Sequence, residues 1–124
     1  MYTMEVHFIS FSKGGIHMLQ AIREGDTALI RMEGELDHCC AQSVRRQLDS
    51  LLLDPTLRHL VLDFAQLRFM DSSGIGVVLG RYRLLRERGG TLSVQHMNPH
   101  VARIFTMSGM GRIIRNLDQQ EALK

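Results

Sequence analysis

The sequence lacks any apolar run that approaches the roughly 20 residues needed to cross a bilayer. Residues 1–17 include Phe8, Ile9 and Phe11, but they lack the longer apolar block and the cleavage site of a secretory signal. We therefore expect the chain to be cytoplasmic and to have no membrane partner.

Cysteine is scarce, and the two that occur, Cys39 and Cys40, are adjacent. A disulfide between neighbouring residues is strained, and one pair cannot staple a domain of this size. His38 precedes them, but no second pair of ligands stands at a spacing typical of zinc sites. The sequence therefore predicts two reduced thiols and no metal site.

No excess of one charge is present, because 15 Lys and Arg residues face 13 Asp and Glu residues, for a net charge of +2. This mildly basic balance is well short of the basic patches typical of nucleic-acid-binding domains. With 124 residues, 44% hydrophobic and 23% charged, the chain is expected to form one globular domain with no direct nucleic-acid partner.

Common catalytic motifs are also missing. The nucleophile elbow needs a glycine two positions before its serine, where this chain has Met70 or Asp71, and no P-loop is present. None of the six histidines has a recognisable triad context. We expect no enzyme and no cofactor. The alternative is a small nucleotide-binding enzyme that uses the Gly74–Gly80 turn, although its third glycine is one residue late for the usual spacing.

Hydrophobic periodicity predicts an alternation of strands and helices. We expect strands at 18–23, 27–33, 57–64, 91–95 and 113–114, and helices at 40–53 and 73–88, from Asn98-Pro99 and from Asp118. Together these elements predict an α/β domain with a mixed sheet of four to five strands and about four α-helices. Residues 1–17 are expected to be a flexible or non-native extension, and residues 18–124 the domain.

Single residues mark details of these elements. Gly34 is expected to end its strand, with residues 35–37 as the exit. Asp118, with Glu121 three residues later, is typical of a capping box. One stripe of the 73–88 helix is expected to face the core, and it consists of Ile75, Val78, Leu79, Tyr82 and Leu85.

The most informative stretch is Asp71-Ser72-Ser73-Gly74-Ile75-Gly76, where a serine stands at the expected start of a helix. Free N–H groups and the helix dipole at such a position tolerate an added phosphate. Because parallel strands end at one edge of a sheet, we expect Asp37 and the Ser72 loop to be neighbours. The alternative is that Asp71, Ser72 or Ser73 only caps the helix.

Four blocks of the sequence resemble the STAS-domain anti-sigma-factor antagonists, and most closely the sporulation-type antagonists of the anti-sigma-F factor. The resemblance spans Met18 to about Leu117. The blocks are Gly-Glu-Leu-Asp-His at 34–38, the strand at 58–63, the stretch from Phe69 to Tyr82, and Phe-Thr-Met-Ser-Gly-Met at 105–110.

The resemblance implies control of transcription by partner switching. In this family, the unphosphorylated antagonist binds an anti-sigma factor and releases the sigma factor. The anti-sigma factor is also an ATP-dependent serine kinase that phosphorylates the first serine after the aspartate, here Ser72, and a PP2C-type phosphatase reverses the reaction. ATP is thus used by the partner kinase. The implied partner-binding residues are Asp37, Asp71, Ser72, Ser73 and Gly74.

Overall fold

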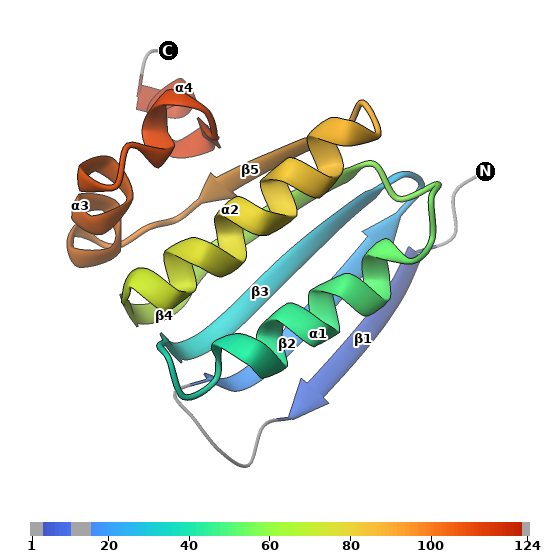
Figure 1. Cartoon of the computed structure of the whole chain (residues 1–124), viewed down its shortest axis with the longest axis horizontal. Coiled ribbons are helices and arrows are strands. Elements are labelled where there is room, and N and C mark those ends of the chain that lie inside the picture. The colour runs from blue at the N-terminus through green and yellow to red at the C-terminus, as the bar shows by residue number, and fades with distance from the viewer. Residues whose placement is uncertain (1–3, 11–15, 123–124) are drawn as a thin grey trace.

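The computed structural model describes residues 4–10 and 16–122, which form a mixed sheet covered on one face by two helices (Figure 1). Six strands lie side by side in chain order, antiparallel from β1 to β3 and parallel from β3 to β6. They are β1 (Met4–Ser10), β2 (Ile16–Glu24), β3 (Thr27–Leu36), β4 (His59–Met70), β5 (Thr91–Gln95) and β6 (Arg115–Asn116).

Three helices connect the parallel strands, and a fourth follows the last strand. They are α1 (Ala41–Leu52), α2 (Ser72–Glu87), α3 (Pro99–Met107) and α4 (Leu117–Ala122), with a 3₁₀ turn at Met110–Arg112. Figure 1 shows α1 and α2 side by side over the sheet, with α3 and α4 beyond β5. The predicted single α/β domain with a mixed sheet and four helices is confirmed, and the sheet has one strand more than the four to five expected.

The additional strand, β1, corrects the prediction for the N-terminal extension. Residues 1–17 were expected to be flexible or non-native, but Met4–Ser10 pairs with β2 along its whole length, from Met4 opposite Glu24 to Ser10 opposite Met18. Residues 16 and 17 already belong to β2. A breaker cluster of residues, Ser12-Lys13-Gly14-Gly15, precedes the expected start of the domain, and it lies outside the described residues. A breaker cluster between two strands and one before a domain have the same sequence pattern.

The core lies between the sheet and the α1–α2 layer. Alternate residues of β3, β4 and β5 point toward these helices and are buried, as the period of two in a strand requires. Phe64 and Leu67 of β4 are also buried. The strand residues beneath the helices include Ala28, Ile30, Met32, Leu36, Leu60, Leu62, Leu92 and Val94, and the helices add Val44, Leu48, Leu52, Val78 and Leu85.

Strands β3 and β4 are both longer than predicted. Gly34 does not end β3, because it is buried within the strand at a φ of 120°, and the pairing with β4 shifts register between Gly34 and Glu35. A residue with a Cβ is strained at this φ, so the glycine accommodates a local irregularity. Strand β4 extends six residues past the predicted end at 64, to Met70.

The predicted core stripe of α2 is correct only in part. Val78 and Leu85 are buried, and Ile75 and Tyr82 pack partly buried against the core. The buried residues Val77 and Arg81 were not expected. They are buried because α2 contacts α1 as well as the sheet, so a wider part of its surface is covered than one stripe.

The C-terminal segment differs in detail from the prediction. The last strand is Arg115–Asn116 and not residues 113–114, and helix α4 begins at Leu117. The carboxylate of Asp118, which was expected in a capping box, accepts the backbone N–H groups of His96 and Met97 at 2.8 and 3.1 Å, and the side chain of Glu121 lies outside the described residues. This contact fastens α4 to the end of β5.

Candidate functional site at the start of α2

Two loops meet at the carboxyl ends of β3 and β4. The backbone N–H of Asp71 donates to the carbonyl of Leu36 at 3.2 Å, and that of His38 donates to Oδ2 of Asp71 at 3.1 Å. The expectation that the Asp37 exit and the Ser72 loop are neighbours is therefore confirmed. Helices α1 and α2 both begin at this end of the sheet (Figure 1).

Asp71 is the N-cap of α2. Its backbone is extended, and its Oδ1 accepts the N–H groups of Ser73 at 2.9 Å and Gly74 at 3.3 Å. Burial alone would raise the pKa of Asp71, but the N–H groups of Gly74, Ser73 and His38 outweigh it and lower the pKa below its usual value. One carboxylate thus closes the first turn of α2 and holds the β3–α1 loop beside it.

Asp37 is held by its own loop. Its Oδ1 accepts the N–H groups of Cys39 at 3.0 Å and Cys40 at 3.3 Å, and its carbonyl accepts that of Ala41 at 3.0 Å. Cys39 is exposed, whereas Cys40 is buried with its Sγ 3.3 Å from the carbonyl of Glu35. This loop presents Asp37 at the same surface as Asp71.

Ser72 is the first residue of α2 and is exposed, whereas Ser73 is partly buried and Gly74 is buried. A Cβ on Gly74 would lie 2.7 Å from the carbonyl oxygen of Leu36 and 2.7 Å from Cγ of Met70. Glycine at 74 therefore permits the start of α2 to pack against the end of β3.

The sequence had suggested free N–H groups in the first turn of α2, but two of them are taken. Those of Ser73 and Gly74 already donate to Asp71. The capping alternative is correct for Asp71, and it leaves the exposed hydroxyl of Ser72 available for another role.

The Gly74–Gly80 segment is not a turn. It lies entirely within α2, so it offers no glycine loop to cradle a phosphate, and the amide of Gly74 is taken by Asp71. The alternative of a nucleotide-binding enzyme is not favoured by this geometry. Within the described residues, no three His, Cys, Asp or Glu side chains lie close enough to hold a metal ion. No helix in the described part of the chain is long and apolar enough to span a membrane.

Sequence reasoning missed an open groove of about 560 Å³ between α1 and α2. Ser73 and the buried Arg81 both line it. An arginine on an amphipathic helix is usually read as a surface residue, so periodicity carries no signal for this position.

Comparison with known proteins agrees with the fold and the resemblance. Residues 18–122 match the STAS domain family. The anti-sigma F factor antagonist of Paenibacillus polymyxa is 42% identical over 92 residues, which cover 74% of this chain and 79% of that protein.

Two solved structures of SpoIIAA are similar as well. Its unphosphorylated form, described as an anti-sigma factor antagonist, has a TM-score of 0.68 at 27% identity, covering 98% of this chain and 93% of that one. Its phosphorylated form, described as a Bacillus cell fate determinant, has a TM-score of 0.62 at 26% identity and covers 98% and 96%. With a family match over residues 18–122, the chain belongs to the STAS-domain family, and it is similar over most of its length to anti-sigma factor antagonists.

Proposed function

We propose that this chain is an anti-sigma factor antagonist that controls sporulation transcription by partner switching. The unphosphorylated form binds an anti-sigma factor that is also a serine kinase, and the sigma factor is released. Phosphorylation on Ser72 ends this binding, and a PP2C-type serine phosphatase restores it. The protein acts in the cytoplasm and is not itself an enzyme, because the kinase uses the ATP.

The observation that carries this proposal is the exposed Ser72 at the start of α2, beside two loops that present Asp37 and Asp71. A kinase needs access to the serine Oγ, and Ser72 offers it. The partly buried Ser73 faces the groove between the helices and offers less access. Support also comes from SpoIIAA, whose structure is known in an unphosphorylated and a phosphorylated form.

The electrostatics of the site support an effect on binding. A phosphate adds a charge of about −1.5 to −2. The amides of Ser73 and Gly74 are already donated to Asp71, so the new charge stands beside a carboxylate and projects from the surface. A partner surface that fits the neutral hydroxyl then meets like-charge repulsion and desolvation. A loss of about 3 kcal/mol lowers affinity on the order of 100-fold, enough to reverse a competition with the sigma factor.

The test uses a cognate anti-sigma factor of the serine-kinase type, incubated with the protein and ATP. We expect tandem mass spectrometry to place the phosphate on Ser72, and titration to show binding of the unphosphorylated form only. Ser72→Ala should bind and resist inactivation, whereas the matched variant Ser73→Ala should still be phosphorylated. Phosphate mainly on Ser73, or no binding by the unphosphorylated protein, would overturn the proposal.

A further inference from the structure

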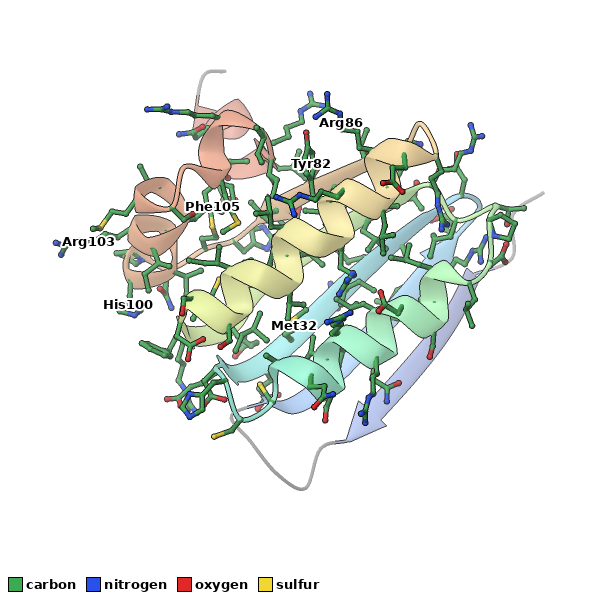
Figure 2. All side chains as sticks on the ribbon, in the orientation of Figure 1. Met32, Tyr82, Arg86, His100, Arg103 and Phe105 are labelled. Atoms are coloured by element: carbon green, nitrogen blue, oxygen red, sulfur yellow. The ribbon has the colours of Figure 1, made fainter. Side chains whose placement is uncertain are left out.

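An open groove lies between α1 and α2 in the helical layer. Its walls come from Ala41, Gln42 and Arg45 of α1 and from Ser73, Gly76, Val77, Gly80 and Arg81 of α2. Figure 2 shows the buried Met32 of β3 between the two helices in this view. The groove therefore opens on the helical face of the domain and reaches Ser73, next to the proposed phosphorylation site.

Two glycines keep the groove open. A Cβ built on Gly76 or Gly80 would meet nothing within 4 Å. Neither glycine is required by close packing, in contrast to Gly74, and glycine within a helix is less stable than alanine. The open space along α2 is thus kept at a cost in helix stability.

Arg81 lies in the wall of this groove with unsatisfied N–H groups. Its side chain is 7% exposed, and its Nε lies 3.0 Å from Oδ1 of Asp49, close enough for an ion pair. The N–H does not point at that oxygen, so within the described part of the chain Nε and Nη1 of Arg81 and Oδ1 of Asp49 have no hydrogen-bond partner. Buried donors without acceptors are costly.

The charges of the groove are also unbalanced. Asp49 faces a second guanidinium, that of Arg45, whose Nε lies 3.8 Å from Oδ2. One carboxylate is therefore shared by two cations. Burial lowers the pKa of Arg81, Asp49 opposes this shift, and the charge of Arg45 adds to it. A further anion in the groove would relieve both the repulsion and the unpaired donors.

We propose that the α1–α2 groove receives the carboxylate of an Asp or Glu side chain from the protein partner that docks at Ser72, with Arg81 and Arg45 as its ligands. A carboxylate matches the planar fork of a guanidinium and accepts from two N–H groups at once. This inference rests on the proposed function, because the partner is the anti-sigma factor.

The groove contact and the phosphate would act at two points of one docking surface. Ser73 lines the same groove as Arg81, and Ser72 is its neighbour on the exposed side. Arg81 follows Ser72 by nine residues, about 13 Å along the axis of α2, so a carboxylate on Arg81 adds to the affinity for the partner without direct contact with the phosphate.

The experiment measures affinity for the anti-sigma factor at 150 mM salt by titration. Arg81→Met keeps an unbranched apolar stem and removes the charged guanidinium. Gly80→Leu fills the groove with a residue that favours helix. We expect each variant to weaken binding at least 10-fold. The control, Arg83→Gln, removes one charge from an exposed position of the same helix outside the groove, and it should change affinity less than 2-fold.

The second measurement neutralises the acidic residues of the partner one at a time and repeats each titration with Arg81→Met. We expect one acidic residue whose effect is lost in the Arg81→Met background. The inference is wrong if Gly80→Leu and Arg81→Met bind the anti-sigma factor as tightly as wild type does. It is also wrong if no acidic residue of the partner couples to Arg81. If wild type does not bind at all, the proposed function fails instead.

Discussion

Asp71 offers the most direct test of how the site is built. Its carboxylate accepts the N–H groups of Ser73 and Gly74 in α2 and of His38 in the β3–α1 loop. Asp71→Ala removes the cap, which costs about 1 kcal/mol, and leaves the loop amide without its acceptor, which costs about 1 kcal/mol more. We expect the free energy of unfolding to fall by about 2 kcal/mol and the thermal midpoint to fall by roughly 8 °C.

Asp71→Asn separates the charge of the cap from its geometry. The amide oxygen still accepts the N–H groups of the first turn, but the negative charge at the helix N-terminus is lost. We expect this variant to cost about 0.5–1 kcal/mol at pH 7, the usual size of a helix-terminus charge effect.

The pH dependence of this difference has a definite sign. The pKa of Asp71 is lowered in the folded protein, so the folded state binds its proton less readily than the unfolded chain does. The contribution of the charge is then fully present above the unfolded pKa of about 3.9 and is lost as the pH falls through the folded pKa. Wild type and Asp71→Asn should differ in stability at pH 6, and the difference should become smaller as the pH falls toward 3.

Urea unfolding at pH 6 and pH 3 measures both effects. Glu33→Gln, which removes one exposed carboxylate from β3, is the control for loss of charge alone. The reasoning fails if Asp71→Ala is no less stable than this control at pH 6. It also fails if the stability gap between wild type and Asp71→Asn is the same at both pH values.

Three further predictions follow from the packing of the domain. Gly74→Ala should lower the free energy of unfolding by about 2 kcal/mol or more because its Cβ would meet backbone atoms, whereas Gly76→Ala should raise it by about 0.5–1 kcal/mol. Urea midpoints that fall in both variants would contradict this contrast. Deleting residues 1–12 should lower the thermal midpoint by several degrees and speed hydrogen exchange in β2, and an unchanged midpoint would argue against the β1 pairing. Arg88→Ala should cost about 2 kcal/mol, with only partial rescue by Arg88→Lys in thermal unfolding, because the guanidinium donates to three carbonyls, those of Leu52, Asp54 and Leu57.

The sequence was sufficient for the elements whose periodicity is undisturbed. The β2–β3 hairpin, α1, β5 and the start of α3 at Asn98-Pro99 all lie where the pattern predicted them. Strand β1 was missed because glycines follow it, and the end of β3 was misplaced because Gly34 was read as a stop. In both cases a glycine within or between strands has the same local pattern as a glycine at a boundary.

The candidate site was predictable in part, because it depends on topology as well as on local sequence. The rule that parallel strands end at one edge placed Asp37 beside Ser72. Asp71 accepts hydrogen bonds from three backbone N–H groups, and one of these belongs to the other loop. These bonds depend on how closely the two loops approach each other. The burial of Arg81 depends on the distance between α1 and α2, and hydrophobic periodicity does not encode this distance.

The geometry of the cap bears on how a phosphate on Ser72 would act. A phosphate at a helix N-terminus is usually stabilised by amides of the first turn. Here the N–H groups of Ser73 and Gly74 already donate to Asp71. They could bond to a phosphate only if Asp71 no longer capped α2. The phosphate therefore gains little from the helix and stands next to a carboxylate. In the proposed switch, its main effect falls on whatever approaches from outside, which is why an exposed serine directly after a capping aspartate suits control of binding better than control of folding.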